Sequence, residues 1–298
     1  MIYQRGYFQI MNNKQEFPNI AQQSHVDFAA YTGNILESVV PNYIPAHWHH
    51  ELEFFYLEEG TADVTVEGEI FHLQSGEGCL INSGALHSFY ATSAKCCLFR
   101  SIVFHASVIG GSTGSIFDRK YIRPFIDFGP PQIIFSPNKE ASVCLELFRT
   151  AYIACQNDYD GFELDVRTSL SKIIHHANAL QPIHAAPLRI PENRIKTMLE
   201  YVDSHYTEQL TVSEISQSAN ICARECQRLF QKYIHCSPME YVRRKRLLSA
   251  AIMLTETDIP IIEIAVLCGF TSHSYFSELF RKLIGKSPSD YRKNKKEA

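Results

Sequence analysis

Short runs of β-branched and aromatic residues alternate with polar residues from about residue 27 to residue 104. Gly and Asn interrupt these runs at intervals of roughly ten residues, a spacing that is typical of antiparallel sheets. Two runs, 61–66 and 70–73, flank the sequence Glu67-Gly68-Glu69 and predict a hairpin. The first part of the chain is therefore predicted to be an antiparallel β-barrel or sandwich.

The pattern changes to a helical period beyond a loop rich in Gly and Ser at 110–115. Residues 139–155 and 162–180 are predicted to be two adjacent amphipathic helices. The apolar stripe of the first of these helices is Val143, Leu147, Phe148 and Ala151. Two such helices can cover one face of a sheet or form the interface of a dimer. We expect a helical dimerisation segment here.

The last hundred residues contain one pattern twice. A short helix, a tight turn and a longer helix are predicted over 212–233, and again about fifty residues later over 261–284. In each longer helix the apolar residues fall at i, i+3, i+4 and i+7, which directs one stripe into a core. The stripes are Cys226, Leu229, Phe230 and Tyr233 in the first copy, and Phe276, Leu279, Phe280 and Leu283 in the second. Two tandem helix-turn-helix units are predicted.

Local signals mark the starts and turns of both copies. Thr211 with Glu214 forms a capping box at the first start, and Pro260 marks the second. Each turn needs a residue that tolerates a positive φ, and Asn220 and Gly269 occupy the matching places. The duplicated helices are therefore predicted to have the same local geometry.

The opposite faces of the two longer helices carry polar and charged side chains. They are Arg224, Glu225, Gln227 and Arg228 in the first copy, and His273, Ser274, Ser277, Glu278 and Arg281 in the second. Such side chains can reach base edges or phosphates when a helix enters the major groove. Double-stranded DNA is the predicted partner, and the alternative is a small helical domain with a duplicated hairpin and no reading role.

The net charge of the whole chain does not indicate a DNA partner, but the charges of its two parts, taken separately, do. The whole chain has a net charge of −4, but residues 1–188 hold 11 Lys and Arg against 19 Asp and Glu, whereas residues 189–298 hold 17 against 13. The basic part is the part with the two recognition helices. A basic run at 243–246 either contacts phosphates or is a solvated helix face.

The second copy resembles the signature of AraC/XylS-type transcriptional regulators. The matching segments are 261–265, 269–270, 274–277, 280–282, 285–288 and 291–292. The resemblance covers about residues 192 to 293 and implies a seven-helix DNA-binding domain whose units are joined by a long helix at about 239–255. It also implies a transcription activator that contacts RNA polymerase. The first copy departs from the family pattern at Ser216, Cys222 and His235.

A cluster of His and Glu lies in the segment 47–53. Strand alternation would send His47, His49, Glu51 and Glu53 to one face of the sheet. The residues at 47, 49 and 53, followed by a Gly at 60, resemble the first cupin motif. The later sequence Gly76, Gly84 and His87 resembles the second motif, with Asn82 where proline is usual.

Three interpretations of this cluster stay open. The four residues His47, His49, Glu53 and His87 could bind a divalent transition metal such as Fe, Mn, Ni or Zn. The same residues with Glu51 could line a pocket for a small-molecule effector, or they could be packed histidines without a ligand. The sensor domains of AraC-type regulators are commonly cupin-like barrels that bind sugars or other small molecules, so the resemblance favours the effector pocket.

The sequence therefore predicts an α+β chain of two domains. A cupin-like, jelly-roll barrel with its helical dimerisation segment takes residues 1–180, a linker takes 181–190, and an all-α double helix-turn-helix domain takes 191–298. Nine irregularly spaced Cys, no export peptide and no apolar run of membrane-spanning length predict a cytoplasmic protein. We expect a homodimeric regulator that is not an enzyme. The alternatives are a metal-dependent cupin enzyme fused to a DNA-binding domain, and a regulator with no effector.

Overall fold

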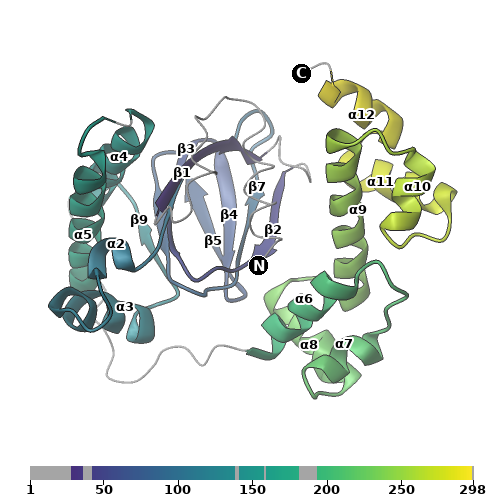
Figure 1. Cartoon of the computed structure of the whole chain (residues 1–298), viewed down its shortest axis with the longest axis horizontal. Helices are drawn as coiled ribbons and strands as arrows, with labels where there is room; N and C mark the ends of the chain where they lie inside the picture. Colours follow the sequence, from purple (N-terminus) through teal and green to yellow (C-terminus); the bar gives the residue numbers. More distant parts are fainter. Residues whose placement is uncertain (1–27, 36–41, 138–140, 158, 181–192, 297–298) are drawn as a thin grey trace. The chain divides into compact units, whose positions relative to one another are not determined.

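The structure is a computed structural model that describes residues 28–35, 42–137, 141–157, 159–180 and 193–296. The chain divides into two compact units, the first built mainly from residues 45–191 and the second mainly from 192–298 (Figure 1). The predicted linker 181–190 lies outside the described residues. No helix in the described ranges is both long enough and apolar enough to cross a membrane.

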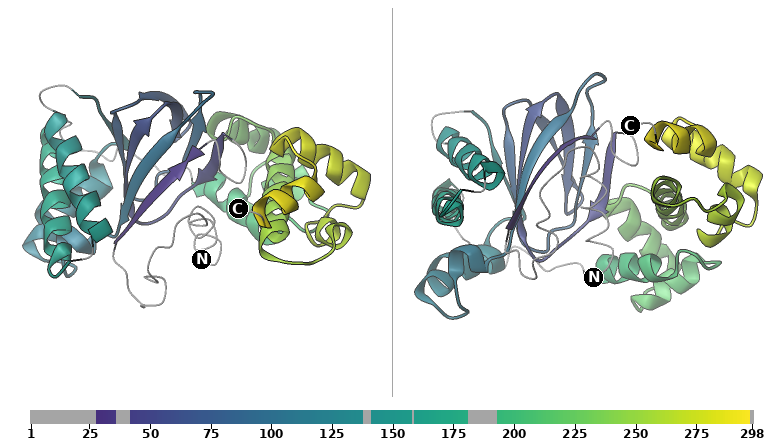
Figure 2. Two further views of the ribbon diagram at one scale, coloured as in Figure 1. Left: turned by 90° about the horizontal axis from the view of Figure 1, so that it is seen from above. Right: turned by 45° about the horizontal axis from the view of Figure 1, so that its top comes forward.

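The first unit contains two hydrogen-bonded β-sheets, which Figure 2 shows from two further directions. The five-stranded sheet has the order β1(Phe28–Asn34), β8(Leu98–Phe104), β3(Leu52–Glu59), β6(Gly78–Ile81), β9(Gln132–Phe135). The four-stranded sheet has the order β2(Tyr43–His47), β7(His87–Ala91), β4(Thr61–Val66), β5(Glu69–Gln74). The predicted antiparallel fold class is confirmed, with the described strands arranged in two sheets and not in one closed barrel.

The predicted hairpin is present between β4 and β5. Val66 pairs with Glu69, so the connection consists of Glu67 and Gly68 alone. Both residues have positive φ, at 50° and 86°. This is the geometry of a two-residue turn whose twist matches that of the flanking strands, which fixes the register of the hairpin.

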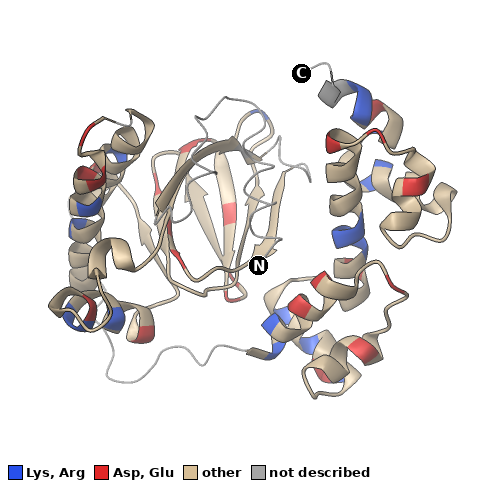
Figure 3. Cartoon of the chain, viewed as in Figure 1, with Lys and Arg blue, Asp and Glu red and all other residues tan. Residues whose placement is uncertain are grey.

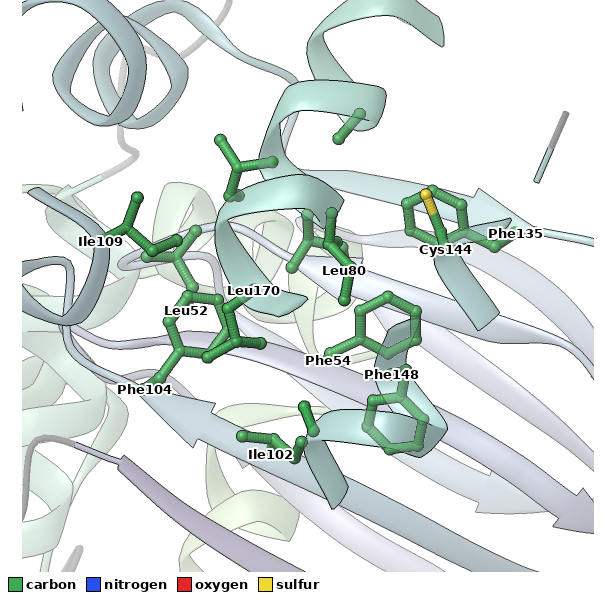
Figure 4. Close-up of a cluster of buried hydrophobic side chains, with 14 of the residues drawn as sticks. Leu52, Phe54, Leu80, Ile102, Phe104, Ile109, Phe135, Cys144, Phe148 and Leu170 are labelled. Atoms are coloured by element: carbon green, nitrogen blue, oxygen red, sulfur yellow. The ribbon is translucent and has the colours of Figure 1, made fainter. Parts of the chain in front are cut away.

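Helices α4(Ser142–Asn157) and α5(Phe162–Leu180) cover the outer face of the five-stranded sheet. Figure 4 shows part of this core, where the ring of Phe54 stacks on those of Phe135 and Phe148 at 5.3 and 4.7 Å between centroids. The short elements α2(Ser107–Gly110), η3(Asp118–Ile122) and α3(Arg123–Phe128) pack against the same core. Residues of β3 are buried on both faces because helices cover one side and the second sheet covers the other.

The predicted stripe of α4 was partly wrong. Val143 was placed on the buried face, but 42% of its surface is exposed, and Leu147 is half-buried. The face that packs on the sheet starts one residue later, and its members are Cys144, Leu145, Phe148, Ala151, Tyr152 and Ala154. One residue corresponds to about 100° of rotation in a helix, so an apolar residue beside the contacting face points to solvent.

The second unit is all-helical. Its described helices are α6(Asn193–His205), α7(Val212–Ser218), α8(Ala223–Tyr233), α9(Pro238–Glu256), α10(Ile261–Leu267), α11(His273–Ile284) and α12(Pro288–Lys296). Helix α9 packs against α7 and α8 of the first helix-turn-helix unit and against α10, α11 and α12 of the second (Figure 1). The seven helices and the long connecting helix agree with the prediction.

The local signals of the repeat have the predicted geometry. The capping box between Thr211 and Glu214 is present. Asn220 and Gly269 both have positive φ, 53° and 83°, in the turns before α8 and α11. The stripe of α8 is buried as predicted, whereas on α11 Leu279 and Leu283 are half-buried, and the buried side chains are Phe276, Phe280 and Ile284.

The recognition helices differ at their first residues, and this difference predicts unequal stability. Ser272 caps α11 by accepting a hydrogen bond from the amide of Tyr275, whereas Cys222 makes no side-chain cap at α8. We expect Cys222→Ser to stabilise α8 by about 0.5–1 kcal/mol and Ser272→Ala to destabilise α11 by about 1 kcal/mol. Native-state hydrogen exchange should therefore slow in α8 of the first variant and accelerate in α11 of the second. Unchanged exchange in both helices would show that the caps are immaterial.

Candidate functional sites

The predicted DNA-reading residues lie on the outer faces of α8 and α11. Exposed side chains on α8 are Arg224, Gln227 and Arg228, with Glu225 half-exposed. Exposed side chains on α11 are His273, Ser274, Glu278 and Arg281, with Ser277 half-exposed. Because the apolar stripes occupy the opposite sides, each helix can enter a groove without losing its packing.

Arg228 and Glu225 form a bidentate ion pair on α8. Nε and Nη2 of Arg228 donate to the two carboxylate oxygens of Glu225 at 2.8 and 2.7 Å. Hydrogen bonds from Arg228 lower the pKa of Glu225, so this carboxyl stays ionised. The pair holds the planar guanidinium in one orientation, which is how an arginine is prepared for bidentate recognition of a base.

A shallow surface hollow of about 430 Å³ lies beside α11. Its lining includes the predicted residues Ser277, Glu278 and Arg281, and also Lys282 and Ser287. The last two were missed by the sequence analysis because Lys282 lies one residue beyond the predicted face and Ser287 follows the helix. Figure 3 shows the Lys and Arg of the second unit in blue.

The basic run at 243–246 is engaged within the second unit. Arg246 donates hydrogen bonds to the carbonyl oxygens of Tyr206 and Glu208 at 2.6 and 2.5 Å, and its guanidinium lies 5.9 Å from the centre of the Phe270 ring. Two further residues of the run form ion pairs, Arg244 with Glu240 and Lys245 with Asp203. Arg246 therefore ties α9 to the loop that precedes α7, a role that the sequence analysis did not predict. Phosphate contact by the run stays a prediction.

The two helix-turn-helix units also contact each other directly. Gly269, in the turn between α10 and α11, lies against the backbone of Thr207, in the loop before α7. A Cβ atom at position 269 would lie 2.6 Å from the carbonyl oxygen of Thr207. With Arg246 beside Phe270, this contact joins the loop of the first unit to the turn of the second.

The His and Glu cluster forms between the two sheets of the first unit. His47 ends β2 and His87 begins β7, which neighbour each other in one sheet, whereas Glu53 lies on β3 of the other. His49 lies in the connection from β2 to β3. The prediction that strand alternation continues through 47–53 was wrong, because the chain leaves one sheet after His47 and enters the other at Leu52.

The structure nevertheless brings the four residues of the predicted metal set together. One ligand atom from each of His47, His49, Glu53 and His87 lies within 4.8 Å of the others. Nε2 of His49 and Nε2 of His87 lie 3.3 and 3.2 Å from the same oxygen, Oε2 of Glu53. Glu51 stands apart from this group, with its carboxylate 3.7 Å from Nδ1 of His49 and its side chain 39% exposed.

Burial and mutual contact set the charges of the cluster. Burial lowers the pKa of His47 to about 3, and the neighbouring His87 and His49 act in the same direction. Burial alone would lower the pKa of His49, but the hydrogen bond and charge of Glu53 outweigh it and raise that pKa. Burial would raise the pKa of Glu53, yet His49 and His87 hold it well below its ordinary value. His47 is thus neutral and Glu53 ionised.

Two groups beside the cluster were missed by the sequence analysis. Ser101 on β8 donates a hydrogen bond from Oγ to Oε1 of Glu53 at 2.6 Å. Tyr31 on β1 has its pKa raised to about 12, by burial first and then by the charge of Glu53. Both residues come from strands far from Glu53 in sequence, so only the strand order could have identified them.

Comparisons with known proteins agree along most of the chain. A model of the AraC-like ligand-binding domain matches residues 40–163, and a model of a helix-turn-helix domain matches 215–294. The chain is 25% identical over 269 residues to an uncharacterized HTH-type transcriptional regulator, YdeC of Bacillus subtilis, covering 89% of this chain and 91% of YdeC. It is 36% identical over 98 residues to the regulatory protein SoxS of Salmonella typhimurium, covering 33% of this chain and 92% of SoxS.

A solved structure is similar over both units. ToxT from Vibrio cholerae matches with a TM-score of 0.51 at 14% identity, covering 90% of this chain and 98% of ToxT. At that identity the likeness concerns the fold, a β-sheet unit followed by a helical unit with two helix-turn-helix motifs.

Proposed function

Because the chain belongs to the AraC family of transcriptional regulators, we propose that it regulates transcription by placing α8 and α11 in successive stretches of the DNA major groove. The duplicated geometry supports this: both helices begin after a positive-φ turn and keep a polar face outside a buried stripe. The proposed reading residues are Arg224, Glu225, Gln227, Arg228, His273, Ser274, Ser277, Glu278 and Arg281.

The first unit acts as the sensor of this regulator. Its ligand site lies between the sheets at His47, His49, Glu53 and His87, with Glu51 at the solvent side. A ligand changes DNA binding only if it binds one arrangement of the protein better than another. The buried, convergent polar groups support the placement of the ligand, because such groups are uncommon in a sheet interior without a role.

Dimerisation through α4 and α5 belongs to the same proposal. Their inner faces pack on the sheet, but Ile153 and Leu164 on the outer side are 55% and 67% exposed. Exposed aliphatic side chains on neighbouring helices are typical of surfaces that meet another protein. Sedimentation analysis of the parent and of Leu164→Asp tests this, since a dimer held elsewhere would not respond to the substitution.

The family supports further elements of the proposal. The regulator works in the cytoplasm on double-stranded DNA and has no catalytic activity of its own. Activation through contact with RNA polymerase rests on the family alone. An in vitro transcription assay on a selected operator distinguishes activation from repression.

Selection of binding sites from random DNA tests DNA reading. We expect the full-length chain to enrich a site with two separate blocks of base preference, one for each recognition helix. Arg224→Ala should flatten one block and Arg281→Ala the other, because each removes a side chain from a different helix. Arg167→Ala removes the same charge from exposed α5 and should change neither block. A folded parent that enriches no site would contradict the proposal.

A further inference from the structure

We propose that Lys232 and Lys282, in the last turns of the two recognition helices, each bind one phosphate of the DNA backbone. The hollow beside α11 is the second of these two phosphate sites. This inference rests on the proposed function, because it concerns how α8 and α11 are fixed on the DNA. It assigns to both lysines a ligand that lies outside the bases.

The internal repeat places a lysine at the same point in both copies. The spacing of fifty residues between the copies relates Lys232 to Lys282, and each lysine is followed by a buried isoleucine and by a Ser-Pro pair at the same offsets. The isoleucines belong to the core and the serines cap the next helices, whereas both lysines are exposed. The preceding residue differs, with Gln231 in one copy and Arg281 in the other. A lysine present in both copies therefore indicates a role outside the core that both copies share.

Each lysine lies at the flank of the face that is proposed to read bases. Lys232 follows Arg228 by four residues, and Lys282 follows Glu278 by the same number. Four residues of an α-helix amount to one full turn and about 40° more. A helix of about 10–12 Å diameter nearly fills a major groove that is about 12 Å wide, so side chains at its flank meet the phosphates along the groove wall.

The hollow at the end of α11 has a charge that suits a phosphate. Arg281 and Lys282 give its lining two positive charges against the one negative charge of Glu278. Ser277 adds a hydroxyl group, which can donate a hydrogen bond to a phosphate oxygen. The volume of about 430 Å³ leaves room for a phosphate that stays covalently attached to the DNA strand.

The positive charges of both lysines are available to such a ligand. Among the described residues, neither Lys232 nor Lys282 forms an ion pair with a carboxylate. Nζ of Lys232 lies 3.2 Å from the hydroxyl oxygen of Tyr233 and 4.6 Å from the centre of its ring, and both contacts leave the ammonium charged. Ser287 also lines the hollow, but its hydroxyl is engaged by Asp290 at the start of α12, so it is not proposed as a phosphate ligand.

A lysine in the last turn of a helix also has a simpler explanation. Its charge can stabilise the helix by complementing the negative end of the helix dipole. This explanation predicts that replacement of Lys232 or Lys282 lowers the melting temperature and leaves the salt dependence of DNA binding unchanged. The phosphate proposal predicts a change in that salt dependence, whether or not the melting temperature changes.

Salt-dependent DNA binding tests the proposal on the full-length chain. The affinities of the parent, Lys232→Gln and Lys282→Gln for an operator selected from random DNA are measured from about 50 to about 200 mM KCl. Each phosphate contact contributes about −0.9 to the slope of log affinity against log salt concentration, so each variant should have a slope shallower by about 0.9. The parent's advantage over either variant should thus shrink by about 3.5-fold across this range. The double variant should be shallower by about 1.8, because the two sites are independent.

Two further variants isolate the charge as the cause. Lys282→Arg keeps the positive charge and should rescue the slope that Lys282→Gln loses. Lys172→Gln removes the same charge from an exposed position on α5 of the first unit and should bind with the parent's slope. The preference for bases should be unchanged in all of these variants, since a phosphate contact carries no sequence information.

Three outcomes would overturn the proposal. Parental slopes in both Lys232→Gln and Lys282→Gln would leave these lysines with the helix-dipole role alone. Loss of a base preference at one operator position would make the replaced lysine a base contact. An equal change of slope in Lys172→Gln would show an effect of net charge and not of position. These three results leave the proposed function standing, whereas a folded parent that selects no operator would contradict the proposed function and this inference together.

Discussion

Gly269→Ala is expected to lower the free energy of unfolding of the DNA-binding unit by about 3 kcal/mol or more. The glycine has φ of +83°, and the new Cβ would lie 2.6 Å from the carbonyl oxygen and 2.9 Å from the carbonyl carbon of Thr207. Both atoms belong to the backbone, so they cannot rotate away as a side chain would. Urea unfolding followed by hydrogen exchange in α9 to α11 measures the loss.

Gly285→Ala is the matched control for that substitution. Gly285 has nearly the same φ, +80°, but a Cβ there would meet nothing within 4 Å. Gly285→Ala should therefore lower the free energy of unfolding only by the cost of placing alanine in the left-handed region, about 1–2 kcal/mol. Equal losses for the two variants would mean that the contact with Thr207 is unimportant.

Arg228→Ala is expected to reduce affinity for the selected operator by about 5- to 150-fold, or about 1–3 kcal/mol. The variant should also lose the preference for one base at one position of the operator. The loss should be confined to that position because Arg228 is held in a fixed plane by Glu225. Binding to a library of operators mutated at each position measures it. Equal weakening at every sequence would indicate a phosphate contact, and no weakening would remove Arg228 from the interface.

Glu225→Gln separates orientation from contact. It keeps the shape of the side chain but removes the charge that engages two nitrogens of Arg228. We expect affinity for random DNA to rise, because one negative charge near the phosphates is removed, while the preference at the Arg228 position falls. A preference that stays at the parent's level would show that Arg228 needs no partner to be oriented.

The second unit was predictable from sequence because its determinants are local. Capping at Thr211 and the positive φ of Asn220 and Gly269 depend on neighbours within a few residues, and they are present as predicted. The AraC-type family and its two helix-turn-helix units are confirmed as well. What local pattern could not indicate was the binding of Arg246 to the loop before α7, which depends on how distant segments meet.

The first unit was less predictable because its site depends on strand order. The antiparallel fold and the hairpin at Glu67 were predicted, and they are confirmed. The two cupin-like motifs placed His47, His49, Glu53 and His87 in one hypothesis, and the structure brings these side chains together. Whether they bind an effector or a metal stays a prediction. Ser101 carries no signal in the sequence, because it is a neighbour of Glu53 only across the sheet.

The contact of Thr207 with Gly269, with Arg246 beside Phe270, has a consequence for the evolution of operators. This contact fixes the two helix-turn-helix units relative to each other. The protein therefore sets the distance between the two DNA subsites and their relative orientation around the DNA axis. Each added base pair rotates the second subsite by about 34° around the DNA axis. A base change within an operator should therefore cost only a modest amount of binding affinity. A single base pair inserted or deleted between the subsites should prevent one recognition helix from contacting its subsite. The operators in a genome should accordingly differ in base sequence far more than in the distance between their two subsites.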